Sequence, residues 1–103
     1  MTLIELANLL ESTGYPVAYS HFKTTTNPPF IVYIETPSTN FFADNKVYRK
    51  GLNVDVEVYT DYKDTEVENK IESLFDEHDI PWESNEVWIE SEKLFQRIYE
   101  ISI

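Results

Sequence analysis

Residues 53–77 decide the fold of this chain; they read NVDVEVYTDYKDTEVENKIESLFDE. In the first eight residues valine alternates with polar residues, and a side-chain period of two is typical of a strand with one buried face. After a polar exit at 61–64, apolar residues recur at offsets of four, seven and eight, the spacing of one helix face. These residues are Val67, Ile71, Leu74 and Phe75. The stretch predicts a half-buried strand and a helix that packs on the sheet, with Thr65 and Glu68 as its capping box.

Upstream of this stretch, the sequence predicts one more helix and two strands. Residues 2–13 carry apolar side chains at helical spacing, Thr2 and Glu5 match a capping box, and Gly14 suits a left-handed C-terminal position. β-Branched and aromatic runs predict strands at 17–22 and 30–36. The polar segment 23–29 ends in two prolines and predicts a hairpin connection between those strands. Gly51 interrupts the run 46–60 and indicates a bulge or bend there.

Downstream, two further strands are predicted at 82–89 and 94–101, separated by the charged turn 90–93. The element order is then α-β-β-β-α-β-β. This order describes an α+β domain with a mainly antiparallel sheet and two helices packed on it. The 103 residues fit a single domain, residues 1–103.

Composition narrows the class of partner. Eight Lys and Arg residues stand against 19 Asp and Glu, a formal net charge of -11, which disfavours specific nucleic-acid binding. There is no cysteine, which excludes disulfides, thiolate zinc sites and a cysteine nucleophile. The first ten residues lack a basic region and Glu5 interrupts their apolar run, so we expect neither a signal peptide nor a membrane span. The sequence predicts a protein that stays inside the cell.

Motifs that would carry chemistry are missing from the sequence. There is no Walker loop, dinucleotide glycine fingerprint or HExxH motif. His21 and His78 are far apart, and we expect a sheet residue and a helix C-terminal group rather than a catalytic pair. Asp61, Asp64 and Glu66 lack the spacing of a calcium loop. We therefore expect no catalytic residue, no cofactor and no metal site, and we expect that the protein is not an enzyme.

Residues 36–45 are the best candidate for a contact with another protein. They read TPSTNFFADN, in which Pro37 and Asn40 break regular strand pairing while Phe41 and Phe42 bring large apolar side chains to a predicted loop. The candidate assembly contact comprises Asn40, Phe41, Phe42 and Asp44. The alternative, that both phenylalanines fill the core, stays open.

Three stretches resemble a known family: TPSTNFFADNKVYRKG at 36–51, VEVYTDYKDTEVENKIESLFDEHDIPWE at 56–83 and VWIESEKLFQRIYEISI at 87–103. They are similar to tail terminators, the head-to-tail joining or tail-completion proteins of long-tailed phages and prophages of low-GC Gram-positive bacteria. The resemblance extends from residue 3 to 103 and rests on pattern, length and element order. The matched positions are Asn40, Phe41, Phe42, Ala43, Asp44, Tyr59, Asp61, Lys63, Asp64, Ile80, Pro81, Trp82, Ser91 and Glu92.

The resemblance implies a structural virion protein, without catalytic residues, that assembles into a ring, typically a homohexamer. The ring sits on the head-proximal end of the tail tube, stops tube growth and docks the head connector. Its partners are then further copies of itself, the major tail tube protein and the head completion protein. Its location is the host cytoplasm during assembly and the virion tail afterwards. Neighbouring minor tail proteins of similar size remain an alternative within the same class.

The acidic balance leads to two further hypotheses. If the ring surrounds a DNA passage, carboxylates that line it repel phosphates and keep DNA from binding. Asp55 and Glu57, opposite the valines of their strand, are the candidate channel lining; the alternative is that they face solvent on the outer wall. A competing function is a small acidic inhibitor or DNA mimic of phage origin. A small acid-base enzyme using carboxylates with a histidine is a weaker hypothesis, because no catalytic constellation supports it.

Overall fold

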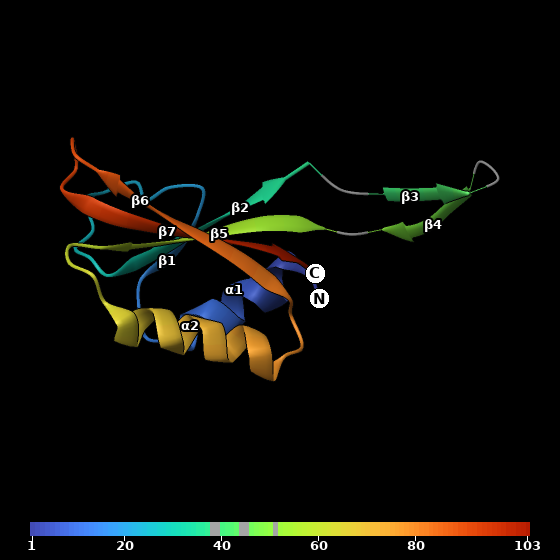
Figure 1. Cartoon of the computed structure of the whole chain (residues 1–103), viewed down its shortest axis with the longest axis horizontal. Coiled ribbons are helices and arrows are strands. Elements are labelled where there is room, and N and C mark those ends of the chain that lie inside the picture. The colour runs from blue at the N-terminus through green and yellow to red at the C-terminus, as the bar shows by residue number, and fades with distance from the viewer. Residues whose placement is uncertain (38–39, 44–45, 51) are drawn as a thin grey trace.

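The computed structural model describes residues 1–37, 40–43, 46–50 and 52–103. A five-stranded sheet carries both helices on one face, and a two-stranded ribbon projects from one end along the longest axis of the molecule (Figure 1). The principal extents are 49 × 28 × 24 Å. The elements are α1 (Leu3–Glu11), β1 (Val17–Tyr19), β2 (Phe30–Thr36), β3 (Asn40–Ala43), β4 (Lys46–Lys50), β5 (Asn53–Thr60), α2 (Thr65–Glu77), β6 (Trp82–Ile89) and β7 (Leu94–Ser102).

The five-stranded sheet has the order β1-β2-β5-β7-β6. Together with the two helices these strands follow the predicted order α-β-β-β-α-β-β, and the mainly antiparallel α+β architecture is confirmed. The predicted hairpin between the first two strands is wrong, because β1 pairs parallel to β2, with Val17 opposite Ile31. The segment between them, residues 20–29, therefore returns to the level at which β1 begins. β1 also ends at Tyr19 rather than at residue 22, since Ser20 has a φ of 69°, which interrupts an extended strand.

The ribbon, β3 paired antiparallel with β4, was not predicted as a unit. Asn40 lies opposite Lys50 and Ala43 opposite Lys46, with an irregularity between Phe41 and Phe42. The predicted loop at 36–45 is therefore wrong at Thr36, which ends β2, and at 40–43, which form β3. The run 46–60 is divided into β4 and β5, as expected. Residues 38–39 and 44–45 of the predicted loop, and Gly51 with its predicted bend, lie outside the described residues.

The core lies between the helices and one face of the sheet. Alternation in β5 places Val54, Val56 and Val58 on this face, almost fully buried. From α2, Val67, Ile71 and Phe75 pack against them; the remaining core residues are Leu6, Leu10, Ile31, Ile80, Tyr99 and Ile101.

Leu74 is a correction to the predicted core. It is only partly buried and lines an open groove between α2 and the end of α1. The buried stripe of α2 follows the spacing i, i+4, i+8 of Val67, Ile71 and Phe75, and Leu74 sits at its margin.

Capping residues explain where α1 begins and ends and where α2 begins. Thr2 and Glu5 form the predicted capping box of α1: the Glu5 N–H donates to Thr2 Oγ1 over 3.1 Å, and the Thr2 N–H donates to Glu5 Oε1 over 3.0 Å. Gly14 follows with a φ of 88°, a left-handed conformation as predicted. In α2 the predicted cap is wrong by one residue. Asp64 caps the helix by accepting from the Val67 N–H over 3.2 Å, while Glu68 binds Lys63.

Candidate functional site

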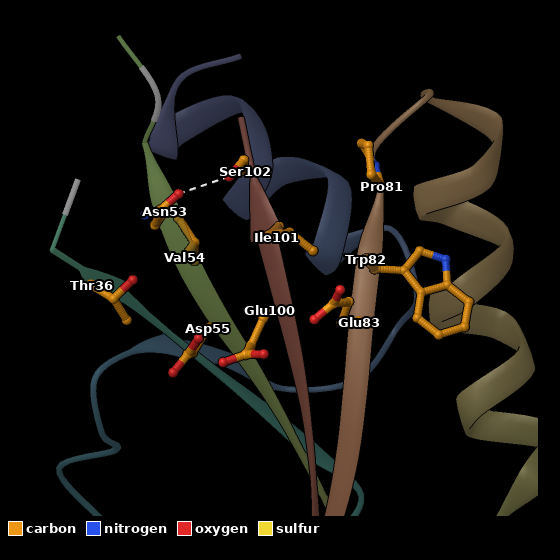
Figure 2. A pocket seen from close by; sticks show the side chains of 10 residues that line it. All are labelled: Thr36, Asn53, Val54, Asp55, Pro81, Trp82, Glu83, Glu100, Ile101 and Ser102. Atoms are coloured by element: carbon orange, nitrogen blue, oxygen red, sulfur yellow. Dashed lines mark hydrogen bonds between the residues drawn. The ribbon is translucent and has the colours of Figure 1, made fainter. Parts of the chain in front are cut away.

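The face of the sheet that points away from the helices carries the candidate site; we call it the open face. Within the described residues no helix covers it. Pairing places Asp55 directly opposite Glu100, and Glu100 directly opposite Glu83, so one row across β5, β7 and β6 carries three carboxylates. The row lies in an open groove of about 410 Å³, which also includes Thr36 and Asn53. Figure 2 shows the three acidic side chains on adjacent strands, with Trp82 turned toward α2. We call this the acidic groove.

The charges of the acidic groove are not balanced locally. Neighbouring strands are about 4.8 Å apart, and like charges directly opposite one another destabilise a sheet. Within the described part of the chain, no ion pair involves Asp55, Glu83 or Glu100. A cation brought to this row would therefore relieve repulsion that already exists in the folded chain.

Hydrogen bonds fix the end of the groove where the ribbon begins. Ser102 Oγ donates to Asn53 Oδ1 over 2.7 Å, as Figure 2 shows, and Asn53 Nδ2 donates to the Pro37 carbonyl oxygen over 2.8 Å. The backbones of Leu52 and Ile103 exchange two hydrogen bonds, of 2.9 and 3.1 Å. The ribbon is thus joined to a firmly bonded end of the sheet.

The opposite end of the open face is covered by the segment between β1 and β2. Phe22 makes an edge contact with Phe30 at 5.4 Å, and Phe30 stacks on Tyr59 at 4.8 Å between ring centroids. The Tyr59 hydroxyl donates to Glu57 Oε1 over 2.9 Å and accepts from Gln96 Nε2 over 2.7 Å. Burial, and next the hydrogen bond to Glu57, raise the pKa of Tyr59 to about 12. Glu57 therefore has a hydrogen-bond partner, whereas Asp55 has no ion pair in the described part of the chain.

A second charged cluster lies on the other face, between α2 and the sheet. Arg97 Nη2 donates to Ser84 Oγ over 3.0 Å, and its guanidinium approaches Glu68 at 3.6 Å and Glu72 at 4.0 Å. Tyr99 donates to Glu72 Oε2 over 2.8 Å, and burial first, then this bond, raise the pKa of Tyr99. The buried Arg97 Nε has no hydrogen-bond partner among the described residues. Because each carboxylate here has a donor or a cation, this cluster attaches α2 to the sheet.

The predicted site residues are distributed over two regions. Asn40, Phe41 and Phe42 lie in β3 of the ribbon, and Asp44 lies outside the described residues. Asp55 and Glu57 share the open face, two residues apart on β5, but only Asp55 belongs to the acidic groove. Their contact and channel roles stay predictions.

The other candidates do not converge. His21 lies after β1, whereas His78 ends α2, where its Nδ1 is 2.9 Å from the Leu74 carbonyl oxygen. Asp64 serves as a helix cap, and within residues 1–37, 40–43, 46–50 and 52–103 no group of three or more His, Asp or Glu side chains is arranged to hold a metal ion. No helix in the same ranges has both the length and the apolar character needed to cross a membrane.

Sequence reasoning missed Glu83 and Glu100 as site residues. Glu100 lies between two apolar residues of a strand, Tyr99 and Ile101, so its position on the opposite face of the sheet could be predicted. Its position between Asp55 and Glu83 depends on strand register, which no local pattern states.

No protein-family model matches this chain. No curated protein matches it either.

Proposed function

We propose that this chain is a structural virion protein, a tail terminator or tail-completion subunit that forms a ring on the tail tube, stops its growth and joins tail to head. The observation that carries the proposal is the pairing of two unlike surfaces on one subunit. One is the open face with its acidic groove, and the other is the ribbon that projects beyond the sheet (Figure 1).

A ring needs such surfaces because each subunit must contact its two neighbours through different patches. The helices occupy one face of the sheet and complete the core, so that face is used by the fold itself. What remains is a sheet face, a projecting ribbon and an edge strand, β6, on which Val87 and Trp88 are exposed. One side of the sheet thus forms the core while other surfaces stay available for contacts, which supports the proposal of an assembly subunit.

The ribbon is the proposed contact with other proteins. It carries Phe41 and Phe42, two of the aromatic residues matched by the resemblance, on a strand instead of in a core helix or in the five-stranded sheet. Aromatic side chains are enriched at the centres of protein interfaces. In the assembled ring, Glu57 on the open face would border the DNA passage.

The test is a deletion of the gene from the phage or prophage genome that encodes it, with electron microscopy of the particles produced on induction. We expect tails of excess and irregular length, separated from filled heads, and restoration of normal tails by the wild-type chain supplied from a plasmid. Tails of normal length joined to heads in the deletion strain would contradict the proposal.

The acidic groove also favours a second candidate, an acidic inhibitor that imitates DNA. Three adjacent carboxylates that pair with no cation among the described residues could occupy a phosphate-binding surface of another protein. This candidate predicts early expression and salt-sensitive competition with duplex DNA for one partner. The basic strand β4 argues against it, because a phosphate mimic gains nothing from Lys46, Arg49 and Lys50.

A further inference from the structure

We propose, on the basis of the ring function above, that neighbouring subunits join by docking the ribbon of one copy in the acidic groove of the next. The contact is head to tail: each copy offers a ribbon to one neighbour and a groove to the other. The occupant of the open face is then a second copy of this chain.

The two-stranded ribbon needs additional packing contacts to be stable. A two-stranded antiparallel ribbon is marginally stable in water at best, and a third strand or a packed helix normally stabilises it. Here β3 and β4 form a sheet of their own, and no third strand joins them within the described residues. A surface on another molecule can supply the missing layer.

Charge selects which surface that is. Lys46, Arg49 and Lys50 lie in the five residues of β4 and are three of the eight basic residues of the chain. With Asp44 as its one acid, the segment 40–50 has a formal charge of +2, which leaves -13 on the rest of the chain, since the whole chain carries -11. The ribbon therefore concentrates positive charge in a subunit that is acidic as a whole, and opposite potentials steer and orient association.

The acidic groove is the complementary surface. Asp55, Glu83 and Glu100 repel one another across three strands and, in the described part of the chain, none has an ion pair. The carboxylates of the helix face, Glu68 and Glu72, are already bound by Lys63, Arg97 and Tyr99 and are not free to receive a ribbon. Neutralisation by β4 of a neighbour removes the repulsion.

The shape of the subunit directs the ribbon to another copy. The ribbon extends away from the sheet along the longest axis, so it does not fold back over its own groove (Figure 1). The groove begins at Thr36 and Asn53, where the ribbon leaves the sheet. Each copy therefore presents its groove beside the root of its own ribbon. In this arrangement Asp55 belongs to the subunit interface, and Glu57 alone remains the candidate for the channel.

Cross-linking of single-cysteine variants tests this contact, because the chain has no cysteine of its own. We would combine Lys46→Cys in the ribbon, labelled with 15N, with unlabelled Glu83→Cys in the groove, and add a short bis-maleimide. Intact-mass spectrometry then distinguishes mixed from homotypic dimers. The control pairs are Lys93→Cys with Glu83→Cys, which uses an exposed cation of the β6–β7 turn, and Lys46→Cys with Glu66→Cys, which uses an exposed acid of α2.

We expect about tenfold more mixed dimer from the ribbon and groove pair than from either control pair, the ratio that corresponds to ~1.4 kcal/mol of preference. The product should be lost in 1 M salt, where charges are screened beyond about 3 Å. Reversal of the ribbon charge by Lys50→Glu in the Lys46→Cys variant should reduce the mixed dimer, and Glu100→Lys in the groove variant should restore it.

Two outcomes overturn the inference: mixed dimer at the level of the controls, or a Lys46→Cys variant that cross-links to itself in preference, which would mean that ribbons pair with each other. The deletion experiment is independent of this result. Mixed dimers from a gene whose deletion leaves normal tails would preserve the contact and refute the tail function. Defective tails without mixed dimers would preserve the function and place the contact elsewhere.

Discussion

The two faces of the sheet differ in burial and in how their charged side chains are compensated. On the helix face, alternate residues of β5 and β7 are buried and the charged groups around Arg97 have partners. On the open face, the same strands place Asp55 and Glu100 side by side with no ion pair in the described part of the chain. One face thus supplies the stability of the fold, and the other retains unfavourable charge that a partner can relieve. Substitutions on the two faces should therefore change stability in opposite directions.

The largest effect is expected from Phe75→Ala in α2. Phe75 is fully buried and contacts Tyr99 edge-on at 5.7 Å, so its removal leaves a cavity as well as losing apolar burial. We expect a loss of about 3 to 5 kcal/mol in the free energy of unfolding, measured by urea denaturation. Leu74→Ala is the matched control, since Leu74 is only partly buried and should cost about 1 kcal/mol or less. Equal losses would mean that the buried stripe of α2 is misplaced.

A smaller loss is expected from Arg97→Met. The substitution leaves Glu68 and Glu72 beside α2 with less positive charge, and Ser84 loses its donor. Because the Arg97 side chain is 24% exposed, we expect about 2 kcal/mol, below the cost of breaking a fully buried ion pair. Lys93→Met, in an exposed turn, serves as the control and should be nearly neutral in the same denaturation experiment. A neutral Arg97→Met would show that the helix face does not depend on its charges.

The open face should respond with the opposite sign. Glu100→Gln removes the central charge of the row formed with Asp55 and Glu83. We expect the isolated subunit to gain about 0.5 kcal/mol, and the gain to shrink with added salt. Glu92→Gln, at an exposed turn position, changes the net charge equally and should produce less stabilisation. A destabilised Glu100→Gln variant would remove the contrast between the faces.

The smallest effect concerns pH and Tyr59. Its pKa is raised from 10.0 to about 12 by burial and by Glu57, so the folded chain holds the phenolic proton more tightly than the unfolded chain. This contribution to stability is complete below pH 10 and is lost as the pH rises through 12. Thermal denaturation between pH 9 and 12 should show a smaller decline for Tyr59→Phe than for the wild type. An identical decline would mean that the Tyr59 hydroxyl is solvated.

Local patterns were sufficient for most of the fold. Helical spacing and caps located α1 and α2, and alternation identified the buried valines of β5. The direction in which β1 pairs with β2 could not be predicted from the sequence. The polar segment after β1 permits a hairpin as well as a parallel connection, and only the packed sheet selects the parallel pairing of Val17 with Ile31.

The site was harder to predict than the fold. Asp55 was singled out because its place in the valine alternation is a local property. Glu83 and Glu100 join it only through the register of β5, β7 and β6, which depends on contacts between residues far apart in the chain. Arg97 was likewise not recognised, since its partners Glu68 and Glu72 come from a helix that precedes it by more than twenty residues.

The root of the ribbon has a mechanical consequence. β3 follows β2 and β4 precedes β5, and β2 and β5 both lie inside the five-stranded sheet and pair along their whole length. A pull on the ribbon along its axis is therefore directed along these strands. Such a load shears many backbone hydrogen bonds at once, whereas a load across an edge strand would peel them one at a time. A subunit held by its ribbon would resist tension well, and we expect the proposed ring to fail by separation of its docked surfaces before any subunit is pulled open.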